Sequence, residues 1–214
     1  VLVESGFTRG LIQKKDANDI DYSSTFYVNL IMSCFIYIIL FFCAPLIANL
    51  YNIPEYLTLE RILFINIILN SLIIVQNARL QKKIDFKTIA VINFFSILVS
   101  GLIGIYAAYS GLGVWAIVVQ SLSRGVLFTI LYWGLGKWYP KLVFSISSFK
   151  NLFSYSSKLL FASIVGNTVD NIGSIIVGKI YNPTIMGYYT RARQFPELTS
   201  GTVSSVLNNV TFPL

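Results

Sequence analysis

Two long stretches of the chain carry no charged side chain, and they constrain the fold more than any other feature. The first lies between Asp21 and Glu55, and the second extends from Thr88 to Ser123. A helix needs about 20 predominantly apolar residues to cross the hydrocarbon core of a bilayer. Charged residues make up 12% of the chain, against about 25% in soluble domains. The sequence therefore predicts an all-α, polytopic transmembrane helix bundle.

Prolines and glycines divide the apolar sequence into about six spans. The second uncharged stretch is too long for one helix across a core of about 30 Å, since a helix rises about 1.5 Å per residue. Gly111 and Gly113 supply a turn within it, and Pro54 and Pro183 mark other breaks because proline lacks a backbone donor. We expect a single transmembrane domain over residues 1–214, with spans at approximately 22–50, 57–78, 87–109, 112–135, 150–178 and 183–212.

Basic residues alternate between the two sides that these spans define. One side carries ten of them: Arg9, Lys14, Lys15, Arg79, Lys82, Lys83, Lys87, Lys137, Lys141 and Lys150. The loops on the opposite side carry only Lys179. Because short cytoplasmic loops are rich in Lys and Arg, the loops near Lys14, Lys82 and Lys141 are predicted to be cytoplasmic. This asymmetry accounts for much of the net charge of +7, so we expect no nucleic-acid partner.

The sequence offers no catalytic or metal-binding constellation. Histidine is absent, which excludes histidine-dependent catalysis and the commonest zinc ligand. The two cysteines, Cys34 and Cys43, lie inside an apolar run, where cysteine behaves as a small hydrophobic residue. No phosphate-binding glycine loop and no nucleophile-elbow motif is present. We therefore expect no enzymatic activity, no cofactor and no metal.

Arg124 lies in the middle of the fourth expected span, with Gln120 four residues earlier on the same helical face. An ionisable group in a spanning helix usually faces the bundle interior or a water-filled cavity. Arg124 therefore contacts an anionic group of a substrate, or it pairs with Asp170 or with a carbonyl of another helix. Both interpretations stay open at this point.

Amide side chains accompany the charges in two other spans. Asp170 lies near the centre of the fifth, flanked by Asn167 and Asn171, and these residues indicate either an ion or proton site or a structural partner for a basic residue. Asn66 and Asn70 are spaced four residues apart in the second span. They either line a polar path or bond neighbouring helices, and the spacing favours helix-to-helix bonding.

The sixth segment contains a cluster of charges. Arg193 and Glu197 are four residues apart and can neutralise one another, whereas Arg191 points to another side of the helix. Arg191 is then the freer cation for a diphosphate. A basic cluster near a helix end can also bind lipid headgroups, and the two interpretations are equally supported.

Short strings spread over nearly the whole chain resemble a known family. They are Gly10-Leu-Ile-Gln-Lys-Lys15, Ala44-Pro45-Leu46-Ile47-Ala48, Asp85-Phe86-Lys87, Gly111-Leu-Gly113-Val114-Trp115-Ala116 and Gly187-Tyr188-Tyr189-Thr190-Arg191-Ala192, followed by Phe212-Pro213. In this order they are similar to the polysaccharide biosynthesis, or oligosaccharide flippase, family of the multidrug/oligosaccharidyl-lipid/polysaccharide exporter superfamily.

The resemblance implies an all-helical transporter of two lobes in the bacterial inner membrane. The spans would correspond to helices three to seven and the start of eight, which is most of one lobe. Family members move lipid-linked oligosaccharides, typically on undecaprenyl diphosphate, for lipopolysaccharide or capsular polysaccharide assembly. The implied partners are the lipid-linked oligosaccharide, membrane lipids and the polysaccharide polymerase machinery.

We accordingly expect Arg124, Arg191, Arg193 and Gln120 to contact the substrate. Asp170, Asn167 and Asn171 are expected to serve ion coupling or charge balance. One alternative is a drug or cation exporter of the same superfamily, which would favour acidic groups in its cavity. Another is a non-catalytic membrane subunit of a polysaccharide assembly complex, which would not require charges at the centre of its spans.

Overall fold

The computed structural model describes residues 18–194, except 52, 54, 144–145 and 182–183. Within these residues all regular secondary structure is helical, and no strand is present. The helices are α2 (Asp19–Tyr51), α3 (Tyr56–Leu63), α4 (Ile65–Lys82), α5 (Phe86–Tyr109), α6 (Trp115–Gly136) and α7 (Ile146–Ile180), followed by a helical stretch at 184–194. The expected loop near Lys14 and the end of the sixth expected span, including Glu197, lie outside the described residues.

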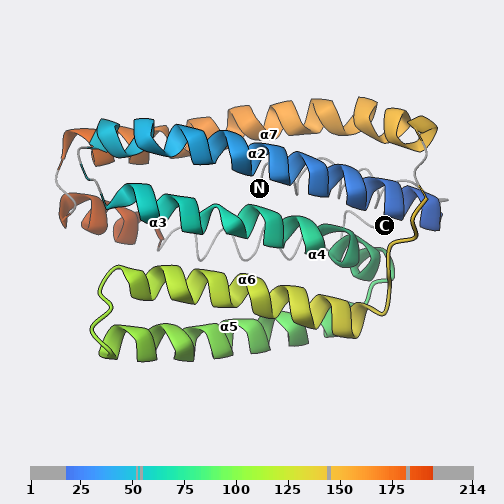
Figure 1. Ribbon diagram of the computed structural model, residues 1–214, viewed down its shortest axis with the longest axis horizontal. Helices are drawn as coiled ribbons and strands as arrows, with labels where there is room; N and C mark the ends of the chain where they lie inside the picture. The colour runs from blue at the N-terminus through green and yellow to red at the C-terminus, as the bar shows by residue number, and fades with distance from the viewer. Residues whose placement is uncertain (1–17, 52, 54, 144–145, 182–183, 195–214) are drawn as a thin grey trace.

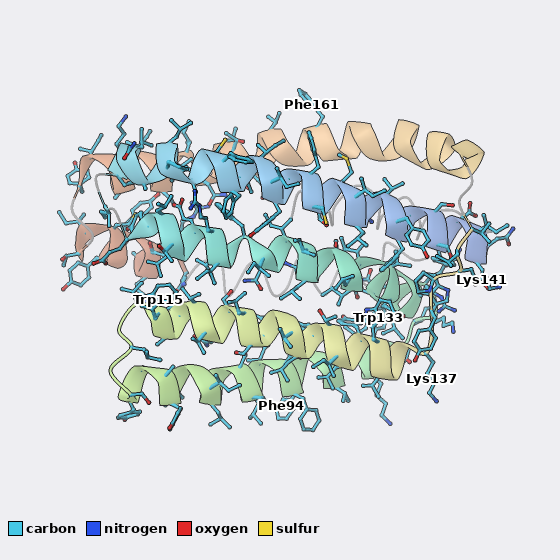
Figure 2. The ribbon with its side chains drawn as sticks, viewed as in Figure 1. Phe94, Trp115, Trp133, Lys137, Lys141 and Phe161 are labelled. Atoms are coloured by element: carbon cyan, nitrogen blue, oxygen red, sulfur yellow. The ribbon has the colours of Figure 1, made fainter. Side chains whose placement is uncertain are left out.

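Four helical segments of the described chain are long and apolar enough to cross a membrane. They are Asp19–Tyr51, Tyr56–Lys82, Phe86–Tyr109 and Trp115–Gly136. The second combines α3 and α4, which only Phe64 separates. Many large apolar side chains of these helices are exposed, and Figure 2 shows Phe94 of α5 pointing away from the bundle. The chain is therefore an all-α helix bundle of a multi-pass membrane protein.

The helices pack in a layered order (Figure 1). α7 contacts α2, α2 contacts α3 and α4, α4 contacts α6, and α6 contacts α5 along most of its length. α4 and α5 touch much less than either touches α6. The order places α7 and α5 on opposite sides of the bundle, with α4 between α2 and α6.

The two ends of the bundle differ in charge. Figure 1 shows that the start of α2, the α4–α5 turn and the α6–α7 connection meet at one end. We call this the basic end, because it carries Arg79, Lys82, Lys83, Lys87, Lys137 and Lys141. In Figure 2, Lys137 and Lys141 lie at this end, and Trp115 lies at the other. That the basic end faces the cytoplasm stays a prediction.

Short capping motifs form the tight turns between the helices. At the end of α4, Ile84 adopts a left-handed conformation (φ 57°), and the Asp85 N–H donates to the Leu80 carbonyl at 3.0 Å. Asp85 then caps α5: its carboxylate accepts hydrogen bonds from the Thr88 hydroxyl at 2.7 Å and the Thr88 N–H at 3.1 Å. These bonds hold the pKa of Asp85 below its ordinary value. Gly111 (φ 79°) and Gly113 (φ 53°) form the predicted turn between α5 and α6.

Aromatic side chains close the basic end of the bundle. Tyr22 and Phe26 of α2 pack edge-to-face against Trp138, with ring centroids 6.2 and 6.3 Å apart, and Phe26 lies 5.8 Å from Trp133 of α6. The guanidinium of Arg79 lies 5.5 Å from the Tyr22 ring and 5.4 Å from the Trp138 ring. We call these five residues the aromatic cluster.

The segment after α6 is held against this cluster by polar contacts. Lys137 turns the chain in a left-handed conformation (φ 48°), which brings Trp138 back into the bundle. The Gln76 side-chain amide donates to the Trp138 carbonyl at 2.6 Å, and the Lys141 N–H donates to the Ser23 hydroxyl at 3.0 Å. The Lys141 ammonium also pairs with Asp19 at 2.9 Å. The connection is therefore fixed to both α2 and α4.

Candidate functional site

A polar groove lies between α4, α5 and α6. It forms because α4 and α5 both pack on α6 but diverge from one another. Its volume is about 470 Å³, within the range of about 300–1,000 Å³ typical of small-molecule sites. The lining residues are Asn66, Asn70, Ile73, Asn77, Gln81, Ile89, Asn93, Ser121, Arg124, Gly125, Phe128 and Tyr132. We call this space the polar groove.

One face of α4 supplies most of the amides. Asn66, Asn70, Asn77 and Gln81 recur at spacings of four, seven and four residues, which places them in a row along one side of the helix. At about 1.5 Å per residue the row extends for about 22 Å, most of a hydrocarbon core of about 30 Å. We call this row the amide ladder.

The ladder is only partly hydrogen-bonded within the described chain. Asn66 donates to the Ser121 hydroxyl of α6 at 3.2 Å. Asn77 accepts hydrogen bonds from Gln81 at 3.2 Å and from the Tyr132 hydroxyl at 3.3 Å. For Asn66, both sequence interpretations hold, since the side chain bonds a neighbouring helix and also lines the groove. Asn70 makes no hydrogen bond to another described residue, so its amide is available to a ligand.

Arg124 is the one charged residue in the groove lining that the structure describes. Its guanidinium lies 5.2 Å from the Phe128 ring on the same helix, and the residue is exposed. Gly125 beside it leaves room for Asn66, because a Cβ at Gly125 would come within 2.6 Å of the Asn66 side-chain oxygen. The close approach places Arg124 near the Asn66 end of the ladder, away from Gln81 and the basic end.

Two residues expected near Arg124 lie elsewhere. Gln120 is absent from the groove lining; its side chain packs on α5 instead, where a Cβ at Gly104 would lie within 3.0 Å of three of its carbons. Asp170 belongs to α7, which packs against α2 on the other side of α4. The structure therefore does not bring Asp170 beside Arg124, and the Asp170 carboxylate is not the partner of this cation.

The other expected site residues gather around α7 and the stretch 184–194. Arg193 donates to the Ser174 hydroxyl of α7 at 3.2 Å, and Arg191 donates to Gln194 at 3.0 Å on the exposed side. On α7 itself, Asn171 donates to the Asn167 carbonyl at 2.8 Å. These residues form a second polar region, separate from the polar groove.

The sequence reasoning missed most of the groove. Asn77, Gln81, Asn93 and Tyr132 were not singled out, although the helical spacing that joins Asn66 to Asn70 continues to Asn77 and Gln81. That spacing is the signal that could have found the ladder. Among the residues that the structure describes, no group of three or more acidic or cysteine side chains is placed to hold a metal ion.

Comparisons with known proteins give a consistent pattern. The sequence profile of a family described as "polysaccharide biosynthesis protein" matches residues 1–214. The chain is 28% identical to the teichuronic acid biosynthesis protein TuaB of Bacillus subtilis, over 100% of this chain and 45% of that protein. It is 22% identical to the succinoglycan biosynthesis transport protein ExoT of Rhizobium meliloti, over 98% of this chain and 42% of that protein.

A third relative is the lipopolysaccharide biosynthesis protein WzxC of Escherichia coli, 20% identical over 99% of this chain and 44% of that protein. The chain thus spans a little under half the length of these curated relatives. No solved structure matches the chain.

Proposed function

Because the chain belongs to the polysaccharide biosynthesis protein family, we propose that it transports a lipid-linked oligosaccharide across the bacterial cytoplasmic membrane for the assembly of a surface polysaccharide. The family match over the full sequence and a relative named as a transport protein support this proposal. The helices that are long enough to cross a membrane support it as well. Transport of this kind is not enzymatic and uses no cofactor.

The observation that carries the proposal is Arg124 in an amide-lined groove between membrane helices. Exposing an arginine to lipid in mid-helix costs at least about 2.5–3.5 kcal/mol, so such a residue usually faces water, substrate or another part of the protein. A guanidinium binds the oxygens of a phosphate with two parallel hydrogen bonds. Arg124 therefore binds the diphosphate of the lipid-linked substrate, while the polyprenyl tail stays in the bilayer.

The charge of the groove favours an anionic substrate over a cationic one. Its described lining includes Arg124 and no Asp or Glu, whereas an exporter of cationic drugs needs an acidic partner for its substrate. In the proposed alternating-access cycle, two lobes rock around the substrate and open the groove to each side in turn. The loops at Lys82 and Lys141 are cytoplasmic in this arrangement.

We propose separate roles for the residues of the second polar region. Arg191 and Arg193 provide further contacts to the substrate, while Asp170, Asn167 and Asn171 provide ion coupling or charge balance. Because they lie apart from the polar groove, we propose that they act at another stage of the cycle. Gln120 supports Arg124 indirectly, by fixing α6 against α5.

The test uses the native gene in its own host. Arg124→Ala is expected to reduce surface polysaccharide about tenfold or more, since a hydrogen bond to a charged group contributes about 1.5–3 kcal/mol. Lipid-linked oligosaccharide should accumulate on the cytoplasmic face. Arg124→Lys retains the charge without the two-pronged geometry and should give an intermediate amount.

The matched control is Ile130→Ala on the exposed face of the same helix, which should leave transport unchanged. Protein abundance in the membrane is measured for every variant, so that a transport defect is separated from a folding defect. Normal surface polysaccharide in Arg124→Ala would overturn the assignment of Arg124.

A further inference from the structure

The polar groove holds far more amide than charge. Four amides of α4 and one of α5 line it, together with hydroxyl groups and a single guanidinium. An amide side chain both donates and accepts hydrogen bonds, whereas a phosphate offers only acceptors to the protein. A row of amides therefore matches groups that also donate and accept, and the hydroxyls of a sugar are such groups. Arg124 is sufficient to bind one anionic group of the substrate. The diphosphate therefore does not account for most of the amides in the ladder.

Bonding between helices does not account for the whole row. Within the described chain, Asn66 and Asn77 bond to α6, but Gln81 bonds to its own helix and Asn70 bonds to no other described residue. The amide nitrogen of Asn93 donates to the Ile89 carbonyl of its own helix at 2.8 Å, although the side chain lines the groove. Phe128 and Tyr132 add aromatic rings to the lining, against which the C–H faces of a sugar ring can pack.

We propose that the amide ladder binds the sugar residues of the transported substrate, in an order set by Arg124. This inference rests on the proposed function and deepens it. With the diphosphate at Arg124, near Asn66, the sugar chain extends along α4 past Asn70 and Asn77 towards Gln81 and the basic end. The groove volume of about 470 Å³ fits a few sugar units, so the ladder contacts the sugar units next to the diphosphate.

Protection of a cysteine placed on the ladder tests this order. The native gene product carries Cys34→Ser and Cys43→Ala, and Asn70→Cys is then introduced; Asn93→Cys is a second reporter on the facing helix. A hydrophilic maleimide is applied to membranes from three host strains. One makes the complete lipid-linked oligosaccharide, one stops after the first sugar phosphate, and one makes no lipid-linked sugar.

We expect both cysteines to be labelled readily in the membranes without lipid-linked sugar and severalfold more slowly with the complete oligosaccharide. The carrier with one sugar should slow the labelling of Asn70→Cys, which lies one helical turn from Asn66, but not that of Asn93→Cys, which lies nearer the basic end. Lys137→Cys, on the exposed turn at the basic end, is the matched control and should be labelled equally in all three membranes.

Three results would overturn the inference. The first is no labelling of either cysteine in sugar-free membranes, which would mean a dry groove. The second is equal labelling in all three membranes, and the third is full protection of Asn93→Cys by the carrier with one sugar. In each case the proposed function is judged separately: it stands if deletion of the gene abolishes surface polysaccharide and Arg124→Ala reduces it, and it fails if neither does.

Discussion

The aromatic cluster and the polar groove use the same two helices, α4 and α6, in opposite ways. Gln76 and Asn77 are neighbours in α4, and both are amides. Gln76 is 1% exposed and donates to the Trp138 carbonyl, so it fixes the α6–α7 connection. Asn77 points into the groove. A polar residue in a membrane helix therefore takes its role from the face on which it lies, and neither its type nor its depth decides that role.

The largest expected effect is at the aromatic cluster. Trp138→Ala removes a buried ring that packs on Tyr22, Phe26 and Arg79, and a buried tryptophan truncation costs about 3–5 kcal/mol. Unfolding of the purified protein in detergent measures this change. Trp115→Ala at the other end of the bundle, where the ring is 38% exposed, is the control and should cost much less. Equal losses would show that the cluster has no special role in stability.

The next comparison uses two amides of α4. Gln76→Ala leaves the buried Trp138 carbonyl without its donor, which costs about 1–3 kcal/mol in unfolding free energy. Asn70→Ala removes a side chain with no hydrogen-bond partner among the described residues and should change stability by about 0.5 kcal/mol or less. For transport activity we expect the opposite order, with a larger loss in Asn70→Ala than in Gln76→Ala, because Asn70 lines the groove. A stability loss in Asn70→Ala as large as that in Gln76→Ala would contradict the distinction.

The smallest expected effect is a pH dependence at the cap of α5. Because hydrogen bonds from Thr88 lower the pKa of Asp85, the stabilisation that they provide is complete above the ordinary pKa of about 3.9. It is lost as the pH falls through the lowered value. Protection factors in the first turn of α5, which correct hydrogen exchange for its slower intrinsic rate in acid, should therefore fall below about pH 4, while those of the buried amides near Trp138 should not. Asp85→Asn should remove this acid dependence; its persistence would assign it to another group.

Much of the fold follows from the sequence, because a charged side chain in lipid and a glycine or proline within a helix both cost free energy. Uncharged stretches and their breaks therefore mark the helices and the turns. The absence of charge between Thr88 and Ser123, with Gly111 and Gly113 inside it, predicts two helices and a turn, and α5 and α6 have this form. A helix can extend beyond the apolar span that the sequence predicts. The second span was expected to end at residue 78, but α4 continues to Lys82, because arginine and lysine are good helix formers and extend the helix beyond its apolar part.

The sequence predicted the candidate site mainly through its charged residue, Arg124. Arg124 stood out because an arginine in a spanning helix is costly. The face shared by Gln120 and Arg124 predicted one site for both, yet Gly104 lets α5 approach closely enough for the Gln120 side chain to lie against it, outside the groove lining. Which helices become neighbours is not visible in the spacing of one helix. Of the ladder, only Asn66 and Asn70 were singled out; Asn77 lies within the expected span 57–78, and Gln81 falls beyond its end.

The length of α2 has a consequence for the membrane itself. Its 33 residues extend for about 50 Å, well beyond a hydrocarbon core of about 30 Å. The first turns carry Asp19, whose carboxylate forms an exposed ion pair with Lys141, whereas the last turns expose Phe42, Leu46 and Leu50. A thicker bilayer can rise over the apolar last turns but cannot cover the polar first turns. Hydrophobic mismatch is therefore absorbed at the far end of α2, and the basic end keeps a constant depth.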